Sequence, residues 1–524
     1  MSPCGSLAAL QGTCQRPLEI AVVGEVQCTF WNFQFLVYTF KLSSVTSNAP
    51  GGEACPRVTG CCESTSCFTM TSLHFFVLLA SSGAAASQTG YFWHITDVHW
   101  DPDYKVTDNP WAVCPSASEP VRNPGKWGSY LCDSPWALIN SSIYAMKDIS
   151  PNPNFIIWTG DDTPHVPNEK LGNKAVLRMI GNVSQLIQHV FPGTKVYAAM
   201  GNHDIHPKSQ FPATGHVIYN RTAELWTPWL DGRSIHTFLK GAFYMEPLLN
   251  REGQRMIILN TNFYYNKNAL TADLSDPAGQ FQWFDDILSR ASTAGEKVYI
   301  IGHIPPGFFE KKRGTHWFQE HFNKRYIEII QKHSQAIAGQ FFGHQHRDSF
   351  KIFYNNGSPV SAMFIAPAVT PWKTTLAGLQ DGSQNPGIRL FEYNTDTLQI
   401  LDMTTYYLNL TFANTWAPRW EKEYCLTEAF QVPDGTVESM QTVLDKLSRD
   451  KSHLQKYYKY NSVSYDLGEC NEWCRTDHVC AIKEVDYARY KNCIKSEGSS
   501  KINEILCFVL LLSVLLSALV FAYN

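Results

Sequence analysis

The chain has 524 residues, of which 44% are hydrophobic and 13% aromatic, and its formal net charge at pH 7 is -4. This hydrophobic and aromatic content is enough for a large buried core and excludes disorder over most of the chain. Together with the length, it predicts a large catalytic domain with smaller attachments. The small negative charge supplies no basic surface, which argues against a nucleic-acid polymer as a partner. A small anionic substrate would have to be held by metal ions.

Residues 70–87 have the pattern of a signal peptide. An apolar run follows Met70, and small residues end it at Ala84-Ala85-Ala86-Ser87, as at a cleavage site. Two interpretations of residues 1–69 stay open: an upstream extension that is absent from the mature protein, which we favour, or a cysteine-rich domain. Seven cysteines lie in this segment, and an odd number could pair only incompletely.

Residues 88–410 alternate between strand-like and helix-like segments. Short apolar or aromatic runs predict buried strands, and the stretches 174–190 and 280–294 predict helices between them. Later runs at 387–393 and 398–408 predict antiparallel additions. The pattern indicates a layered α/β domain with a central sheet system. The predicted buried strands are 92–95, 155–158, 196–199, 256–259, 298–301 and 341–342.

Residues 411–495 are expected to form a small helical C-terminal domain. A charged helical segment at 436–459 precedes a cluster of four cysteines. These cysteines, together with Cys114 and Cys132 that flank a loop, are predicted to form disulfides in a secreted chain, which leaves Cys425 over. Buried free thiols in a cytosolic enzyme are the alternative. The C-terminal cluster is Cys470, Cys474, Cys480 and Cys493.

Two further signals point to export and to the cell surface. Residues 505–523 are almost wholly apolar and small residues precede them, which predicts a GPI-attachment signal over 496–524 with Ser496 as the attachment site. A membrane-spanning helix is the alternative. We therefore expect a glycoprotein anchored to the outer leaflet of the membrane. The five N-x-S/T acceptors are Asn140, Asn182, Asn220, Asn356 and Asn409.

Five short motifs with metal-ligand residues follow apolar runs in the 88–410 region. Carboxylate and amide oxygens mixed with imidazoles suit Zn²⁺ or a related divalent ion, and five strand ends could gather them at one edge of a sheet. A single histidine is more often a core residue, but the ordered combination indicates a two-metal hydrolase. The motifs are Asp97-Val98-His99, Gly160-Asp161, Gly201-Asn202-His203-Asp204, Gly302-His303 and Gly343-His344-Gln345-His346.

Spacing within the motifs suggests individual roles. Residues two apart, such as Asp97 and His99, would point to the same side at the end of a strand. Asp161 is preferred over Asp162 as a carboxylate that bridges two cations, because it directly follows a glycine that lets the backbone approach closely. Asp204 has two equal interpretations: it orients the neighbouring histidine or it caps a turn.

Longer segments around these motifs resemble a known family. They are His94-Ile-Thr-Asp-Val-His99, Asp101-Pro-Asp-Tyr104, Trp158-Thr-Gly-Asp-Asp-Thr-Pro-His165 and Gly201-Asn-His-Asp204. Over about residues 89–495 the chain is similar to the acid sphingomyelinase-like phosphodiesterases of the calcineurin-like metallophosphoesterase superfamily, and its hydrophobic tail resembles that of the membrane-anchored b-type. The resemblance implies a two-sheet sandwich flanked by helices, with two zinc ions. One zinc would be held by Asp97, His99, Asp161 and His346, and the second by Asp161, Asn202, His303 and His344.

The same resemblance implies a general acid. His165 matches the family's acid position, and Pro164 stands where the wider superfamily has the last aspartate of Gly-Asp-x-x-Asp. That departure favours the sphingomyelinase branch, with His165 as the acid and His203 as the second candidate. A solvated loop histidine is the alternative interpretation of His165.

The resemblance also implies a zinc phosphodiesterase that acts outside the cytosol. Residues 1–69 lack the six-cysteine helical pattern of a saposin-type lipid-binding domain, so nucleotides and CDP-alcohols are the preferred substrates, and a membrane phospholipid is the rival. One alternative function is a membrane-anchored regulator that binds lipids or a receptor in inflammatory signalling. Another is a metal-binding pseudoenzyme, but the presence of every metal ligand argues against it. We expect a monomer. The aromatic residues that could line a substrate groove are Tyr264, Tyr265, Trp111, Trp127 and Trp136.

Overall fold

A computed structural model describes residues 25–30, 33–38, 88–376 and 382–496. The predicted signal peptide and the hydrophobic tail lie outside these residues. Contacts divide the chain into two units, one ending at Ala86 and the other beginning at Ser87. The described part of the first unit is an antiparallel hairpin, which the sequence did not predict. Its strands are β1 (Glu25–Phe30) and β2 (Phe33–Tyr38).

The first sheet of the second unit has six strands in the order β14-β13-β12-β3-β4-β5. Strands β3, β4 and β5 run parallel to one another, and β12, β13 and β14 extend the sheet in antiparallel fashion from β3. This arrangement confirms the predicted antiparallel additions. The strands are β3 (Thr89–Ile95), β4 (Phe155–Trp158), β5 (Lys195–Ala198), β12 (Gly387–Asn394), β13 (Ile400–Leu408) and β14 (Trp420–Cys425).

The second sheet also has six strands, in the order β10-β11-β9-β8-β7-β6. Its central strands β7, β8, β9 and β11 are parallel, and the edge strands β6 and β10 are antiparallel to their neighbours. The strands are β6 (Tyr244–Pro247), β7 (Gln254–Ile258), β8 (Lys297–Ile301), β9 (Ile337–Phe342), β10 (Ser349–Asn355) and β11 (Ser358–Ile365).

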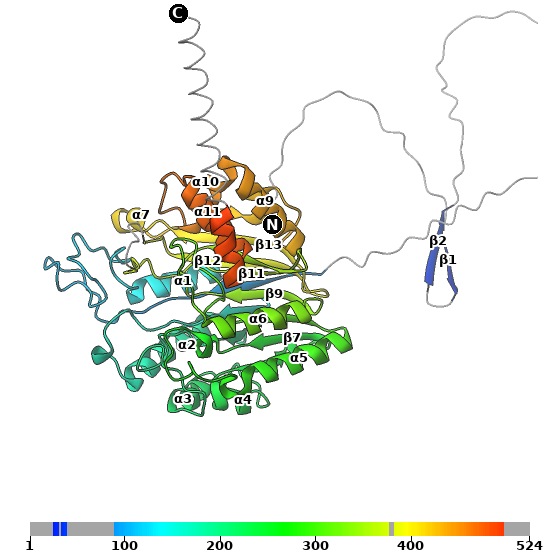
Figure 1. Ribbon diagram of the computed structural model, residues 1–524, viewed down its shortest axis with the longest axis horizontal. Coiled ribbons are helices and arrows are strands. Elements are labelled where there is room, and N and C mark those ends of the chain that lie inside the picture. The colour runs from blue at the N-terminus through cyan, green and yellow to red at the C-terminus, as the bar shows by residue number, and fades with distance from the viewer. Residues whose placement is uncertain (1–24, 31–32, 39–87, 377–381, 497–524) are drawn as a thin grey trace, which may run out of the picture. The chain divides into compact units, whose positions relative to one another are not determined.

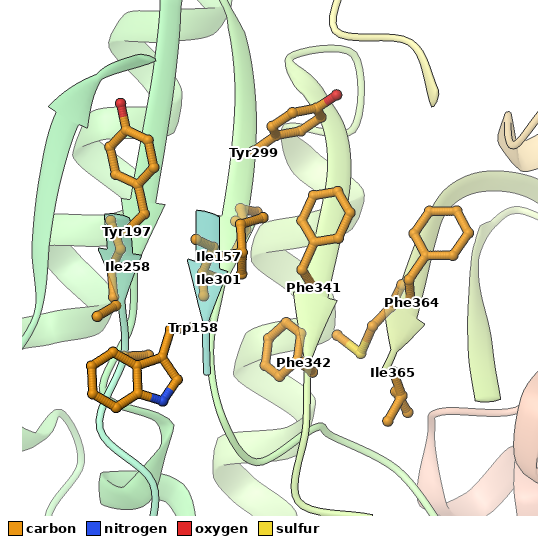
Figure 2. Packing of buried hydrophobic residues seen from close by; sticks show 14 of the residues in the cluster. Ile157, Trp158, Tyr197, Ile258, Tyr299, Ile301, Phe341, Phe342, Phe364 and Ile365 are labelled. Carbon is orange, nitrogen blue, oxygen red and sulfur yellow. The ribbon is translucent and has the colours of Figure 1, made fainter. Parts of the chain in front are cut away.

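Aromatic side chains fill the space between the two sheets. The ring of Phe92 on β3 lies 5.4 Å from that of Phe341 on β9 and 5.8 Å from that of Tyr299 on β8. Figure 2 shows Tyr299, Phe341 and Phe364 side by side across neighbouring strands of the second sheet. Parallel strands are buried on both faces, so they consist of nearly continuous apolar runs, which made them visible in the sequence.

Helices cover the outer faces of the sandwich, and α5 and α6 lie along the second sheet in Figure 1. The predicted helix 280–294 coincides with α5, and the predicted helix 174–190 begins one residue earlier as α2. The helices before the C-terminal region are α1 (Trp136–Ile149), α2 (Asn173–Val190), α3 (Val217–Leu225), α4 (Ile235–Gly241), α5 (Gln280–Ala294) and α6 (Glu320–Lys332). Short 3₁₀ turns occur at Asn168–Lys170, Leu248–Asn250, Thr261–Tyr264 and Pro277–Gly279.

The C-terminal region is mostly helical, as predicted. The expected single segment 436–459 is two helices, because Asp450 leaves the helical conformation and its side chain accepts a hydrogen bond from the backbone N–H of Ser452 (2.7 Å). Strand β14 belongs to the first sheet, so this region continues the sandwich. The helices are α7 (Leu410–Thr415), α8 (Leu426–Phe430), α9 (Val437–Arg449), α10 (Lys451–Asn461) and α11 (Glu472–Lys483).

Three disulfides form within the described residues: Cys114–Cys132, Cys470–Cys474 and Cys480–Cys493. They use the six cysteines predicted to pair. The buried Cys425 is in none of them, and its Sγ donates to Oδ2 of Asp402 (2.6 Å). None of the helices in the described ranges combines the length and the apolar character that a membrane crossing requires. The predicted anchor signal lies almost wholly beyond these ranges and stays a prediction.

Candidate metal centre

The seven predicted ligands meet where β3, β4, β5, β8 and β9 end. Five of them have left-handed backbone, with φ of 49° at Asp97, 38° at His99, 62° at Asp161, 68° at His344 and 59° at His346. Non-glycine residues rarely adopt this conformation, and it concentrates at functional sites. The expected mechanism for residues two apart is therefore wrong: Asp97 and His99 lie beyond the end of β3, and left-handed backbone rather than an extended strand sets the direction of their side chains.

Two glycines let the loops after β4 and β5 come into contact. A Cβ atom on Gly160, whose φ is 85°, would lie 2.2 Å from the backbone nitrogen of Gly201. A Cβ atom on Gly201 would lie 2.1 Å from Oδ1 of Asp161. Because neither position leaves room for a side chain, the loops after β4 and β5 can approach closely enough to share Asp161.

One group of donor atoms surrounds His99. Its Nε2 lies 3.7 Å from Oδ1 of Asp97, 3.5 Å from Oδ2 of Asp161 and 3.2 Å from Nε2 of His346. Ligands at 2.0–2.1 Å from a tetrahedral Zn²⁺ lie about 3.3 Å from one another. Among the described residues Oδ1 of Asp97 is buried without a hydrogen-bond partner. The spacing and this unpartnered oxygen fit a divalent ion.

A second group surrounds His303. Its Nε2 lies 3.1 Å from Oδ2 of Asp161 and 3.2 Å from Oδ1 of Asn202. His344 completes a cluster with Asp161 and His303 whose ligand atoms lie within 4.8 Å of one another, and its Nε2 has no hydrogen-bond partner in the described part of the chain. The same oxygen of Asp161 thus belongs to both groups. Asp161 therefore has the position expected of a bridging carboxylate.

Backbone carbonyls fix the protonation of two histidines. Nδ1 of His99 lies 2.7 Å from the carbonyl oxygen of Thr163, and Nδ1 of His303 lies 2.7 Å from that of Thr159. A carbonyl only accepts, so Nδ1 must carry a proton in both rings, and Nε2 is the nitrogen that would give its lone pair to a metal ion. Such outer hydrogen bonds orient metal-binding imidazoles and increase their basicity.

Two roles were predicted for Asp204, and the structure shows the capping role. Its carboxylate accepts hydrogen bonds from the backbone N–H groups of Asp161 (2.9 Å), Asp162 (2.8 Å) and Gly201 (2.8 Å). Burial, and then the charge of Asp161, raise the pKa of Asp204 to about 6. Burial also opposes ionisation of Asp161, but His303 and His203 outweigh it and hold the pKa of Asp161 well below its usual range. The shared ligand is therefore a carboxylate.

The two predicted acid candidates lie beside the first group. The ring of His165 stacks on that of Trp372, with centroids 3.7 Å apart and an interplanar angle of 6°, and lies 4.1 Å from the ring of His99. His203 lies 4.4 Å from His165. Burial lowers the pKa of both histidines, although Asp133 opposes the effect at His165 and Asp161 opposes it at His203. His165 is thus a packed residue of the centre and not a solvated loop histidine.

Asp133 and Trp372 are functional candidates that the sequence did not reveal. Oδ1 of Asp133 lies 3.0 Å from Nδ1 of His165, and Oδ2 accepts a hydrogen bond from the backbone N–H of His165 (2.6 Å). Thr370 donates a further hydrogen bond to Oδ1 (3.1 Å). Asp133 follows Cys132 of a predicted disulfide, which was the one available signal, and Trp372 has no motif around it.

The centre lies in a cleft of about 410 Å³. Tyr265 lines it, as predicted, together with Phe309, Trp317 and Trp372. Tyr264 instead stacks on Phe281 in the core, with centroids 4.2 Å apart. The three predicted tryptophans, Trp111, Trp127 and Trp136, lie outside the lining of this cleft.

The predicted modification sites are not among the residues that line the cleft. Among the glycosylation acceptors, the side chains of Asn220, Asn356 and Asn409 are exposed, and those of Asn140 and Asn182 are half-buried on helices. Ser496 is the last described residue, and its hydroxyl donates to the carbonyl of Cys493 (3.0 Å). Modification of these residues stays a prediction.

Comparisons with known families and proteins agree with this geometry. The model of the calcineurin-like phosphoesterase family matches residues 90–348, and that of the acid sphingomyelin phosphodiesterase C-terminal region matches residues 358–500. The fold and the site thus define a calcineurin-like metallophosphoesterase, a family that uses a dimetal centre.

Individual relatives show to which group of the calcineurin-like metallophosphoesterases the chain belongs. The chain is 57% identical over 440 residues to the acid sphingomyelinase-like phosphodiesterase 3b of Homo sapiens, which covers 83% of this chain and 97% of the relative. It is 40% identical over 444 residues to the cyclic GMP-AMP phosphodiesterase SMPDL3A of Homo sapiens (84% and 97% covered), and 36% identical over 433 residues to the sphingomyelinase phosphodiesterase C of Dictyostelium discoideum (80% and 96% covered). The chain belongs to the acid sphingomyelinase-like phosphodiesterase family and is a phosphoric diester hydrolase.

Proposed function

We propose that this enzyme is a zinc phosphodiesterase that hydrolyses phosphodiester or phosphoanhydride bonds of small substrates, with nucleotides and CDP-alcohols preferred. The observation that carries the proposal is the position of Asp161, whose Oδ2 lies 3.5 Å from Nε2 of His99 and 3.1 Å from Nε2 of His303. One carboxylate oxygen between two donor groups is the arrangement that a two-metal centre needs.

The two donor groups would hold one ion each. Imidazole nitrogens combined with carboxylate and amide oxygens suit zinc better than magnesium or calcium, which prefer oxygen alone. When bound, such ions neutralise phosphoryl oxygens and lower the pKa of an attacking water. Metal analysis of the purified chain by inductively coupled plasma mass spectrometry tests the identity of the metal, and zinc is expected at twice the molar concentration of protein.

His165 would supply the proton that the leaving group needs. Asp133 holds Nδ1 of its ring, and stacking on Trp372 keeps the ring in place, so Nε2 is the nitrogen left to serve the substrate. In-line attack forms a bond from the water oxygen to phosphorus, and the water releases one proton to solvent. The bond to the leaving oxygen breaks, this oxygen takes the proton from His165, and His165 then regains a proton from solvent. His203 is the second candidate, and its backbone N–H donates to Oδ1 of Asp161 (2.7 Å).

The cleft and the relatives support a small phosphodiester substrate. A cleft of about 410 Å³ is of the size that small ligands occupy. One relative is named for cyclic GMP-AMP and another for sphingomyelin, so both a nucleotide and a lipid belong in the test. Purified protein should be assayed against a panel of nucleotides and CDP-alcohols beside sphingomyelin in micelles. Preferential turnover of sphingomyelin would contradict the proposed preference.

We also propose that the enzyme acts on the extracellular face of the cell membrane. Three disulfides and three exposed N-x-S/T acceptors are consistent with passage through the secretory pathway. A GPI anchor attached at or near Ser496 would place the cleft beside membrane lipids and receptors that control inflammatory signalling. Release of the enzyme from intact cells by a GPI-specific phospholipase is the expected result, whereas retention would favour a spanning tail.

Catalysis and regulation by binding can be separated by substitution. His165→Ala together with Asn202→Ala should abolish hydrolysis while the protein stays folded and at the surface. If an inflammatory response of the cell changes as hydrolysis is lost, the enzyme reaction is responsible. If the response is unchanged, the alternative holds, in which the protein regulates by binding lipids or a receptor.

A further inference from the structure

Two lysines line the cleft beside the metal donors. Lys208 lies on the loop after β5 that also carries Asn202, and Lys267 follows the 3₁₀ turn Thr261–Tyr264. The ammonium of Lys208 donates one hydrogen bond to the carbonyl of Val166 (2.5 Å), which leaves two N–H groups for a ligand. In the described ranges neither ammonium forms an ion pair with a carboxylate, and Asp133, Asp161 and Glu169 act on Lys208 only from farther away. In these ranges, the lysines that form ion pairs with carboxylates are others: Lys195, Lys311, Lys324, Lys332, Lys373, Lys422 and Lys451.

The loops that carry the two lysines are joined to each other. The side-chain amide of Gln210 donates to the carbonyl of Lys267 (2.8 Å), and its oxygen accepts from the backbone N–H of Ala269 (3.2 Å). Asn168 in turn accepts from the backbone N–H of Lys208 (3.0 Å). These contacts fix the backbones of the two lysine-bearing loops.

Each lysine lies near the second donor group. The ammonium of Lys267 lies 5.6 Å from the centre of the Tyr265 ring, and that ring lies 5.2 Å from His344. Lys208 lies on the loop that carries Asn202, the amide ligand of the same donor group. Partial burial lowers the pKa of both lysines. An anion between them would offset their mutual repulsion and lost hydration.

We propose that Lys208 and Lys267 form a subsite for the second phosphoryl group of a diphosphate substrate, next to the metal centre that takes the first. This inference rests on the proposed function and names its substrate class: phosphoanhydrides of the nucleoside diphosphate type. The same charges disfavour a phosphocholine lipid, because its one phosphate is followed by a trimethylammonium group that the lysines would repel.

The test compares substrates with one and two phosphoryl groups. Lys208→Met and Lys267→Met should each lower kcat/KM for CDP-glycerol about tenfold, as expected for loss of one charge-assisted hydrogen bond at a partly exposed site, mainly through KM. Hydrolysis of bis(p-nitrophenyl) phosphate should change by less than about twofold, because a single phosphoryl group leaves the subsite empty. Lys208→Arg should recover most of the loss. Lys324→Met, on the surface of α6, is the control for net charge.

Binding gives a readout that does not depend on turnover. Imidodiphosphate should bind to the wild-type enzyme in calorimetry, and the double variant Lys208→Met/Lys267→Met should bind it about 100-fold more weakly. Equal losses with both substrates, or imidodiphosphate binding that is independent of the lysines, would overturn the subsite. If the wild-type enzyme hydrolyses neither substrate while lysine-dependent binding persists, the proposed function fails and the subsite stands.

Discussion

Replacing Asp133 by asparagine should separate proton donation from metal binding. Asp133 contacts His165 twice, through the ring Nδ1 (3.0 Å) and through the backbone N–H (2.6 Å), and an asparagine side chain would keep the shape but lose the charge. A hydrogen bond between buried charged groups contributes about 1.5–3 kcal/mol. If this free energy stabilises the proton-donating His165 in the transition state, its loss should lower the rate of hydrolysis about 10- to 150-fold. Metal content should not change, because Asp133 is outside both donor groups.

The assay uses leaving groups that differ in their need for a proton. An alkyl phosphodiester requires protonation of the departing oxygen, whereas p-nitrophenolate leaves without it, so Asp133→Asn should slow the alkyl substrate much more. On a His165→Ala background, Asp133→Asn should have no further effect, because the two residues act as a unit. Equal slowing of both substrates, or full additivity of the two substitutions, would refute the reasoning.

Three other predictions test the centre and the fold. Asp161→Asn should remove the charge that both donor groups share, so the metal content after dialysis should fall below that of the wild type and hydrolysis should be lost; unchanged metal content would contradict a bridging role. Gly160→Ala should lower the free energy of unfolding by about 2 kcal/mol or more, from left-handed strain and from the 2.2 Å approach to Gly201, as measured by denaturant titration against Gly193→Ala, which has similar backbone strain but open space around it. Burial raises the pKa of Glu423, and its Oε2 has no hydrogen-bond partner among the described residues. Since the folded state then binds the proton more tightly than the unfolded state, stability is present at low pH and falls as pH rises above the unfolded pKa towards the folded one. Glu423→Gln should therefore raise the melting temperature at pH 8 but not at pH 4, and an equal change at both would refute it.

The pattern of apolar residues along the chain predicted those helices and strands whose burial repeats regularly from residue to residue. The interior strands were visible because both their faces are buried, and α5 because its apolar face repeats along the helix. The break between α9 and α10 was missed, because both sides of Asp450 continue a helical pattern and only the capping contact marks the boundary.

The ligands were predictable and their neighbours were not. Each ligand motif directly follows a strand, so position in the sequence and position at the sheet edge coincide. Asp133 and Trp372 reach His165 from loops far away in the chain, and no spacing relates them to it. Lys208 and Lys267 are equally inconspicuous, since lysines on loops are usually solvated.

The sequence by itself determined the chemistry of this protein: which donor atoms exist, that they follow strands, and which family they indicate. Only the tertiary structure decided how these atoms combine. The 3.1 Å approach of His303 to Asp161 joins the end of β8 in one sheet to the end of β4 in the other, and it arises from the packing of aromatic side chains between the sheets. Such packing depends on residues distant in the chain, so no local pattern can specify which oxygen is shared, which nitrogen is protonated, or which lysines line the cleft.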